Sequence, residues 1–233
     1  MAKISREKWK VYQNVFDEFT LRTLFKLSSQ GHFLELQSPI SIGKESNVFS
    51  AITETGRIIV KIYRLETCDF NKMYDYIKQD PRYLYLRKHK RKIVFAWTQR
   101  EYRNIMKARD ASVDVPKPIT FLNHILLEEF IGDSNAAPML KDDPPENAQK
   151  FLDSVILNMK KLYSANLVHG DLSGFNILNY KNNPIFIDFS QATQLNAPDA
   201  MELLDRDIRN IAIFFRKQGL DVDEQKIKKQ ITK

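Results

Sequence analysis

The sequence predicts an α+β fold of two lobes, in which a strand-rich half is followed by a helical half. Between Pro39 and Phe130, short runs of β-branched and aromatic residues are separated by glycine-containing turns. Beyond residue 144, apolar residues recur instead every three or four positions, as on the buried face of a helix. The expected parts are an N-terminal helix packing on the core within 1–38, an N-terminal lobe over 39–131 and a C-terminal lobe over 132–233.

The composition is that of a folded protein with a large core, since 43% of the 233 residues are hydrophobic and 28% are charged. The lone cysteine, Cys68, excludes an intrachain disulfide and any CxxC metal or redox motif, and this usage is typical of a reducing interior. We find neither an apolar signal core at the N-terminus nor a membrane-spanning stretch, so we expect a cytoplasmic protein. The net charge of +7 and the pI of about 9.3 are compatible with a polyanionic partner.

Periodicity and turn residues define the elements of the first half. Apolar residues spaced three and four apart predict an amphipathic N-terminal helix that ends near Gly31. The charged, tyrosine-rich segment 64–91 predicts an irregular insertion that is mobile or faces a partner. In order, we expect a helix over 9–27, strands around 40–42, 48–52 and 57–63, the insertion, a helix over about 94–108, and strands over 119–122 and 125–130.

The second half is expected to be mainly helical. After DDPPEN, Pro145 suits the first turn of a helix and Glu146 suits its positive dipole end. Apolar residues from Ala148 to Tyr163 then form a continuous buried stripe. A hairpin follows, and a last helix over about 198–217 ends at Gly219.

The hairpin lies in the stretch HGDLSGFNILNYKNNPIFIDF, residues 169–189, with a turn expected at 181–184. If the strands pair about Asn182, residues whose numbers sum to 364 face each other, so Asn176 lies opposite Asp188. A shift of one residue would move these two side chains to opposite faces. An amide oxygen and a carboxylate at one point suit a hard divalent cation, so we expect Mg²⁺, with Mn²⁺ as an alternative, at Asn176 and Asp188.

A third polar residue, Asp171, precedes Asn176 by five positions in the loop that leads into the first hairpin strand. From there its carboxylate can reach the far side of a metal-bound phosphate and orient an attacking hydroxyl or water. One such residue alone would be interpreted as a turn cap on a surface hairpin. All three together, after His169 and Gly170, favour a site for Mg²⁺ and the phosphates of ATP.

The first half contains the residues that a triphosphate needs. The segment GKESNV, 43–48, lies between two expected strands, and Gly43 allows its backbone to approach a ligand. Lys61 falls in the middle of the strand 57–63, where burial of its charge would need an acidic partner. Glu101 is the preferred partner, with Glu128 and Glu129 as alternatives.

Together these motifs resemble the protein-kinase fold, and most closely the RIO family of atypical kinases, over residues 39–217. SIGKESNVFSA resembles the family's phosphate loop, VKIYR its strand lysine and LLEEFIG with APMLKD its hinge. LVHGDLSGFNIL resembles its catalytic loop, IDFSQA its metal loop and RDIRNIAIFF its closing helix. VKIYR and LVHxDLS favour the type 1 group, as does the absence of room for a winged-helix domain before residue 39, whereas GKES points away from it.

The resemblance implies a role for each matched residue. Asp171 is the catalytic aspartate, Asn176 and Asp188 hold the metal, and Lys61 contacts the α- and β-phosphates and pairs with Glu101. In this family the metal-loop aspartate is also associated with an aspartyl-phosphate, which implies that Asp188 accepts a phosphoryl group and that the protein has an ATPase cycle as well as kinase activity. The other nucleotide contacts that the resemblance implies are Ile42, Gly43, Lys44, Glu45, Ser46, Asn47, Val48, the backbone of Glu129 and Ile131, and Pro138.

The sequence departs from ordinary protein kinases in two places. The HGD motif lacks the arginine that binds a phosphorylated loop, and the 45 residues after Asp188 contain no APE segment (233 − 188). We therefore expect a minimal variant without an activation segment or the usual peptide-binding subdomains. The resemblance further implies a role in maturation of the small ribosomal subunit.

Three alternatives remain at this stage. A small-molecule phosphotransferase of the aminoglycoside or choline type shares HGDxxxxN and IDF but usually has a larger acceptor-binding part. The small kinase of the tRNA threonyl-carbamoyl complex is compact but normally carries DFG where this chain has Asp188-Phe189-Ser190. The third alternative is a non-catalytic assembly factor that senses ATP.

A basic run, RKHKRK at 87–92, precedes the helix that carries Glu101. Cations are unfavourable at the positive end of a helix. We interpret the run as a solvated charged surface, with a contact to ribosomal RNA phosphates as the alternative hypothesis. The small-subunit precursor and its rRNA are the partners that we expect besides ATP, without membrane or DNA. Tyr74, Tyr76, Tyr83 and Tyr85 in the insertion are interpreted as packing residues, with stacking on RNA bases as the alternative.

Overall fold

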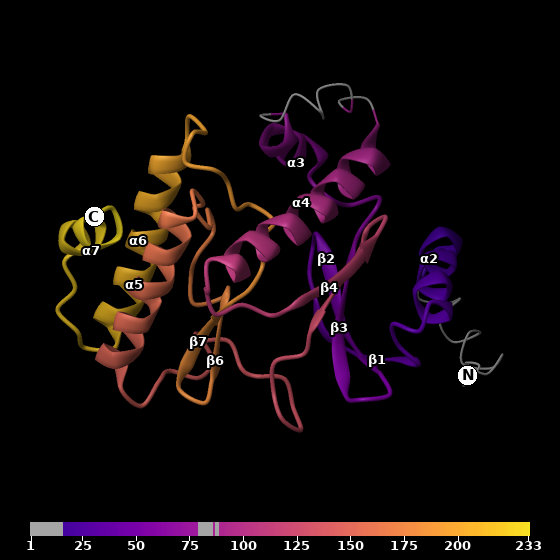
Figure 1. Cartoon of the computed structure of the whole chain (residues 1–233), viewed down its shortest axis with the longest axis horizontal. Coiled ribbons are helices and arrows are strands. Elements are labelled where there is room, and N and C mark those ends of the chain that lie inside the picture. The colour runs from indigo at the N-terminus through magenta and orange to yellow at the C-terminus, as the bar shows by residue number, and fades with distance from the viewer. Residues whose placement is uncertain (1–15, 79–85, 87–88) are drawn as a thin grey trace. The chain divides into compact units, whose positions relative to one another are not determined.

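A computed structural model describes residues 16–78, 86 and 89–233 (Figure 1). The chain divides into two compact units. The first unit comprises Met1–Gln99 and Pro118–Phe130, and the second comprises Arg100–Lys117 and Ile131–Lys233. Within the described residues, no helix combines the length and the apolar character that crossing a membrane requires.

The first unit is built on a five-stranded antiparallel sheet with the strand order β1-β2-β3-β5-β4. All five strands expected from the sequence are confirmed. Their alternating apolar residues form one buried cluster, which includes Phe49, Val60 and Leu127. The strands are β1 (Glu35–Ile42), β2 (Ser46–Ile52), β3 (Arg57–Tyr63), β4 (Pro118–Leu122) and β5 (Ile125–Glu129).

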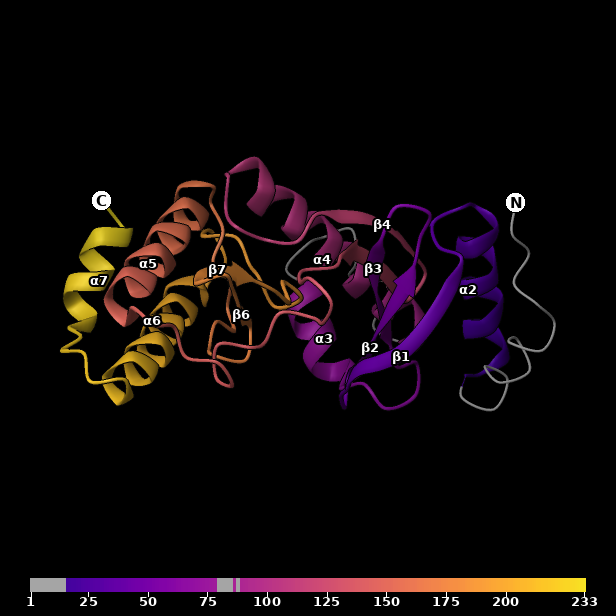
Figure 2. The ribbon, with the colours of Figure 1, turned by 90° about the horizontal axis from the view of Figure 1, so that it is seen from below.

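Helix α2 (Glu18–Ser29) lies against this sheet beside β1 (Figures 1 and 2). Its Leu24 and Leu27 belong to the same buried cluster as the strands. The Asp17 side chain caps it by accepting a hydrogen bond from the Thr20 N–H (2.9 Å). Gly31 follows its end with a φ of 83°, as expected, and residues 9–15 of the expected helix lie outside the described residues.

The segment 64–91 is not wholly irregular, as the sequence predicted, because it contains α3 (Phe70–Ile77). Met73 and Ile77 of α3 are buried in a second cluster with Trp97 of α4 (Lys90–Asp110). Tyr76 packs edge-on against Trp97, with ring centroids 5.7 Å apart, in agreement with the packing interpretation. Tyr83 and Tyr85 lie outside the described residues, and α4 confirms and extends the helix predicted over 94–108.

In the second unit, α5 (Ala148–Ser164), α6 (Ala200–Lys217) and α7 (Glu224–Ile231) lie side by side (Figures 1 and 2). Helix α5 buries the predicted stripe through Phe151, Val155 and Leu162. The prediction that Pro145 occupies the first turn of this helix is wrong. Asn147 caps α5 by accepting a hydrogen bond from the Lys150 N–H (2.9 Å), so Pro145 precedes the helix.

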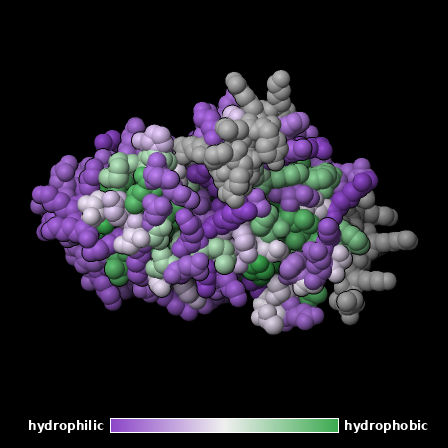
Figure 3. Space-filling model, turned by 45° about the horizontal axis from the view of Figure 1, so that its top comes forward, coloured by the Kyte–Doolittle hydropathy of each residue, from purple (hydrophilic) through white to green (hydrophobic). Residues whose placement is uncertain are grey.

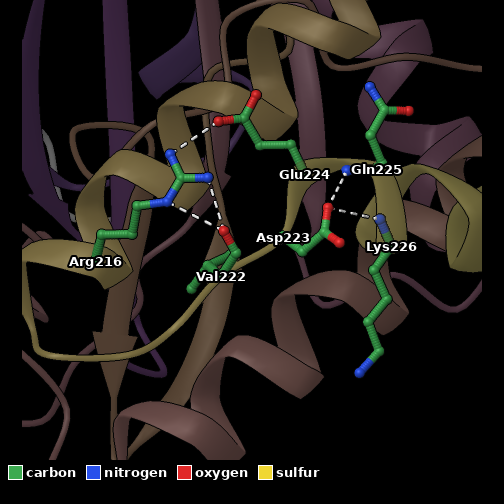
Figure 4. Close-up of polar contacts among 6 residues, drawn as sticks. All are labelled: Arg216, Val222, Asp223, Glu224, Gln225 and Lys226. Carbon is green, nitrogen blue, oxygen red and sulfur yellow. Dashed lines mark hydrogen bonds and ion pairs between the residues drawn. The ribbon is translucent and has the colours of Figure 1, made fainter.

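Helix α6 ends at Lys217, two residues before Gly219, and α7 follows after a short turn. The Arg216 guanidinium holds this turn by donating to the Val222 carbonyl from Nε (3.1 Å) and Nη2 (2.7 Å) (Figure 4). Asp223 caps α7 through the N–H groups of Gln225 and Lys226. The surface around α7 is largely hydrophilic (Figure 3).

Candidate functional site

The hairpin of the second unit is formed by β6 (Ile177–Tyr180) and β7 (Asn183–Phe186), but its register differs from the expected one. Paired residues sum to 363, as in Ile177 with Phe186, and not to 364. The turn consists of Lys181 and Asn182 alone, with φ values of 53° and 58°. A two-residue turn of this type matches the twist of the strands and shifts the register by one residue from the expected pairing about Asn182.

The predicted cross-strand pair of Asn176 and Asp188 is therefore wrong as a pair. The Asn176 carbonyl instead accepts a hydrogen bond from the Ile187 N–H (3.0 Å). Asp188 lies beyond β7 and has a φ of 61°, a left-handed conformation that is uncommon for an aspartate. Its side-chain direction is thus set by a turn, in which the Ser190 N–H approaches Asp188 Oδ1 (3.4 Å), and not by the alternation of a strand.

Asp171 and Asn176 are held together by direct hydrogen bonds, a contact that the sequence did not predict. Asn176 Nδ2 donates to the Asp171 carbonyl (2.8 Å) and to Asp171 Oδ2 (3.2 Å). The amide nitrogen of Asn176 is occupied by these contacts, so its oxygen faces away from Asp171 and can bind a cation. The Asn176 N–H also donates to the Ser173 carbonyl (3.0 Å), which closes the loop between the two residues.

His169 connects this loop to the segment that carries Asp188. The ring is 2% exposed, and its Nε2 lies 3.0 Å from the Ile187 carbonyl. Because a carbonyl only accepts, Nε2 carries the proton. Next in the chain, Gly170 has a φ of 78°, and a Cβ atom there would lie 2.9 Å from the Gln191 carbonyl oxygen, so only glycine fits without a backbone shift.

Helix α6 holds the backbone on both sides of Asp171. The Asp207 carboxylate accepts hydrogen bonds from the Gly170 N–H (2.8 Å, Oδ2) and the Leu172 N–H (2.8 Å, Oδ1). Arg206 donates to the Gly170 carbonyl, and Asn210 Nδ2 donates to the Leu172 carbonyl (3.1 Å). Burial raises the pKa of Asp207 to about 7, although both backbone hydrogen bonds act in the opposite direction.

The sequence did not assign a role to Asp207, Arg206 or Asn210, which it identified only as part of RDIRNIAIFF. A signal was nevertheless present. Asp207 falls on the buried stripe of an amphipathic helix, between Leu204 and Ile208, where an acid needs hydrogen-bond donors from a neighbouring element.

In the first unit, residues 43–45 form a tight turn between β1 and β2. The Gly43 N–H donates to the Ser46 carbonyl (2.9 Å), so this N–H is used within the turn. Residues that follow β3 hold the turn through the Lys44 and Glu45 carbonyls and also bind the Asn47 side chain in β2. These contacts are Arg64 N to Glu45 O (2.9 Å), Cys68 Sγ to Glu45 O (3.3 Å), Thr67 Oγ1 to Lys44 O (3.3 Å) and Arg64 Nη2 to Asn47 Oδ1 (3.1 Å).

Lys61 is 6% exposed in the middle of β3, with its Nζ 5.2 Å from the centroid of the Tyr63 ring. Glu101 is fully buried in α4. These two residues belong to different compact units, and their pairing stays a prediction. Of the other predicted nucleotide contacts, Ile131 accepts a hydrogen bond from Ala137 N (2.9 Å), and Pro138 accepts one from Asn179 N (2.9 Å).

Among the residues that the structure describes, no group of three or more His, Cys, Asp or Glu side chains is arranged to hold a metal ion. The predicted metal donors are instead the amide oxygen of Asn176 and the carboxylate of Asp188. This set fits a cation such as Mg²⁺, which retains water and phosphate ligands beside one or two protein groups.

Comparison with known proteins gives consistent matches. The RIO domain family matches residues 47–227. RIO-type serine/threonine-protein kinase Rio1 of Haloferax volcanii is 39% identical, over 97% of this chain and 79% of that protein. The Rio1 of Methanocaldococcus jannaschii is also 39% identical, over 97% of this chain and 78% of its own length.

The solved structures add a likeness of fold. The Rio2 kinase–ADP/Mg²⁺–phosphoaspartate complex of Chaetomium thermophilum superposes with a TM-score of 0.69. It shares 21% sequence identity, and the match covers 92% of this chain and 66% of that chain. The α+β kinase-like fold expected from the sequence is thereby confirmed.

Proposed function

The chain belongs to the RIO family of atypical serine/threonine kinases, and from this premise we propose that it transfers the γ-phosphoryl group of Mg²⁺-bound ATP with Asp171 as the catalytic base. The observation that carries this proposal is the fixed backbone around Asp171. Asp207 binds the N–H groups on both sides of it, and Asn176 binds its carbonyl and carboxylate. A base held in this way needs little reorganisation to orient an attacking hydroxyl or water.

Asn176 and Asp188 are the residues that we assign to the metal. When bound with ATP, Mg²⁺ supplies neutralisation of the charge on the phosphates. The amide oxygen of Asn176 faces away from Asp171, and the left-handed backbone at Asp188 turns its carboxylate out of the strand direction. These features let each residue offer one oxygen while water and phosphate oxygens complete the coordination.

Lys61 and the turn at Gly43–Glu45 are assigned to the phosphates. Lys61 is a buried cation, so it needs an anionic partner, which ATP phosphates and Glu101 together can provide. The remaining predicted contacts, including the hinge backbone at Glu129 and Ile131, are assigned to the adenine on the resemblance alone.

Asp188 is also a candidate phosphoryl acceptor. The complex of the Chaetomium thermophilum Rio2 kinase contains a phosphoaspartate, which supports the same chemistry here. In this step a carboxylate oxygen of Asp188 forms a bond to the γ-phosphorus, the bond to the ADP oxygen breaks, and water later hydrolyses the acyl phosphate. The protein would then act as an ATPase as well as a kinase.

The partner that we propose is the precursor of the small ribosomal subunit, contacted through the basic run at 87–92. Arg87 and Lys88 lie outside the described residues, whereas Lys90, Arg91 and Lys92 are exposed at the start of α4. No acidic residue occupies the first turn of this helix to offset their charge. Replacing the five basic residues with glutamine should weaken binding to small-subunit precursors and flatten its dependence on salt, while ATP binding is retained.

Two variants test the chemistry. Asp171→Ala should abolish phosphoryl transfer but still bind Mg²⁺–ATP, and Asp188→Ala should lose Mg²⁺-dependent ATP binding as well. ATP hydrolysis with and without small-subunit precursors, followed by acid and hydroxylamine treatment of the protein, would detect an acyl phosphate. Normal ATP turnover by both variants would mean that the catalytic site lies elsewhere. If the unmodified protein binds ATP but shows no turnover, the alternative of a non-catalytic, ATP-sensing assembly factor is favoured.

A further inference from the structure

An aromatic ring is exposed within the catalytic loop itself. Phe175, directly before Asn176, exposes 61% of its surface. Its backbone is nevertheless fixed, since the Phe175 N–H lies 3.3 Å from Ser173 Oγ and the neighbouring Gly174 carbonyl accepts from the Lys141 N–H (3.0 Å). Single exposed apolar residues are common, but a ring on a fixed backbone in the same loop as the proposed catalytic base is the kind of anchor that binding partners use.

The turn Met139–Asp143 lies against this loop and determines the charge around Phe175. The N–H groups of Asp142 and Asp143 both donate to the Met139 carbonyl (2.9 and 3.1 Å), which closes the turn. Lys141 Nζ lies 5.1 Å from the centroid of the Phe175 ring and 2.5 Å from Asp142 Oδ1. The ring therefore already has a cation at its face, and that cation is paired with a carboxylate.

The net charge of this turn is negative. Within Met139–Asp143, Lys141 contributes one positive charge and Asp142 and Asp143 contribute two negative charges, which leaves a formal charge of −1 (+1 − 2). Asp143 Oδ2 accepts from the neutral amide of Asn179 (3.1 Å), and this contact does not reduce its charge. A polyanion such as RNA would bring its phosphates towards these carboxylates, so this surface favours a cationic partner.

We propose that Phe175 and the turn Met139–Asp143 form the docking surface for the phosphoryl acceptor, and that this acceptor is a protein segment with a serine or threonine next to arginine or lysine. The inference rests on the proposed function, in which Asp171 receives the proton of the hydroxyl as its oxygen bonds to the γ-phosphorus and ADP departs. The Phe175 ring takes the apolar stem and the cationic group of the neighbouring side chain. Asp142 and Asp143 supply the opposite charge.

The test uses two labelled peptides of equal length, in which one serine is flanked either by arginines or by glutamates. Binding is measured by fluorescence anisotropy and phosphorylation by steady-state kinetics. We expect the unmodified protein to prefer the arginine peptide, and Phe175→Ala to weaken its binding about five-fold, which corresponds to about 1 kcal/mol. Phe175→Tyr retains the ring and should bind within about two-fold of the unmodified protein.

The matched control is Phe25→Ala, because Phe25 is equally exposed (59%) on α2 and belongs to no proposed site. It should leave peptide binding unchanged. Asp142→Asn with Asp143→Asn should reduce the preference for arginine over glutamate. Melting temperatures of all variants, read by circular dichroism, separate a lost contact from a lost fold.

Three results would overturn the inference: equal binding of both peptides by the unmodified protein, unchanged binding by Phe175→Ala, or displacement of the arginine peptide by single-stranded RNA in a manner that depends on Phe175. ATP hydrolysis by the unmodified protein without any peptide tests the proposed function separately. ATP hydrolysis without selective peptide binding would reject the docking surface and support the proposed function. Selective peptide binding without any ATP turnover would reject the proposed function and support the docking surface.

Discussion

Replacement of Asp207 by asparagine should reduce phosphoryl transfer without touching any atom that contacts the nucleotide. The two carboxylate oxygens of Asp207 each accept one backbone N–H, on the residues directly before and after Asp171. Asparagine has one oxygen and one NH₂ group, so it satisfies one N–H and opposes the other. We therefore expect Asp207→Asn to displace the loop on one side of Asp171.

The magnitude follows from these contacts. A buried N–H left without an acceptor costs about 1–3 kcal/mol, and the same range applies to the stability of the second unit. A displacement of about 1 Å at a catalytic group can reduce the rate about 100-fold. We expect kcat to fall about 10- to 100-fold, with a much smaller change in the KM for ATP.

The pH dependence provides a second, independent signature. The folded pKa of Asp207 is raised to about 7 from 3.8, chiefly by burial and also by Asp171, while Arg206 acts to lower it. The folded state thus keeps a proton that the unfolded state loses, and the free energy of unfolding should decrease by roughly 4 kcal/mol as the pH rises from about 4 to about 7. Activity should change in the opposite direction, because only the ionised carboxylate accepts both N–H groups.

The assay measures kcat and urea unfolding from pH 4 to pH 8.5 for the unmodified protein and Asp207→Asn. Asp205→Asn is the control, since Asp205 lies on the same helix but pairs with Lys228 (2.6 Å) and not with the catalytic loop. Asp207→Asn should have a low kcat at every pH. Its free energy of unfolding should not decrease between about pH 4 and pH 7 as it does in the unmodified protein. A variant with the kcat and both pH profiles of the unmodified protein would refute the reasoning.

Three further predictions concern single contacts. Burial lowers the pKa of His124 to about 4 from 6.5. The contribution of neutral His124 to the free energy of unfolding is therefore complete above pH 6.5, and roughly 3 kcal/mol of it should be lost as the pH falls through 4. His124→Gln should lack this loss in urea unfolding. Gly43→Ala places a Cβ 2.9 Å from the Ser46 carbonyl oxygen, and the shifted turn should raise the KM for ATP about ten-fold; an unchanged KM would argue against a phosphate contact there. Arg216→Ala removes both hydrogen bonds to the Val222 carbonyl and should destabilise the docking of α7 by about 1 kcal/mol, detected as faster amide exchange confined to that helix.

The sequence predicts elements well where periodicity extends over many residues. The strands β2 to β5 and the helices α4, α5 and α6 were expected from their repeated apolar residues, whereas β1 was expected only around 40–42 and begins earlier, at Glu35. Helix α3 was missed because it spans eight residues and buries only Met73 and Ile77, too few for a periodic signal. The start of α5 was misplaced because two signals competed, and the Asn147 cap prevailed over Pro145.

The sequence likewise predicted some features of the candidate site and missed others. Asp171 and Asn176 were named as site residues from the loop motif, but their direct contact was not predicted, because a spacing of five residues does not fix which side chains of a loop meet. Asp207 was not assigned because it is distant in sequence and reaches the loop through backbone N–H groups, which carry no side-chain signature. Only the fold brings α6 to this loop.

The predicted hairpin register was wrong, yet Asn176 and Asp188, the residues inferred from it, remain the best metal candidates. Side-chain alternation assigns residues to faces only while the backbone is extended, and β7 ends at Phe186. Asp188 has a left-handed φ of 61°, so the one-residue shift in the strands does not fix the direction of its side chain. Left-handed backbone costs an aspartate roughly 1 kcal/mol, and it persists where flanking residues are held. Here Phe189 is fully buried and the Ile187 carbonyl is bound by His169. The end of the strand pattern at Asp188 is therefore itself a sign that this residue is placed for something other than sheet pairing.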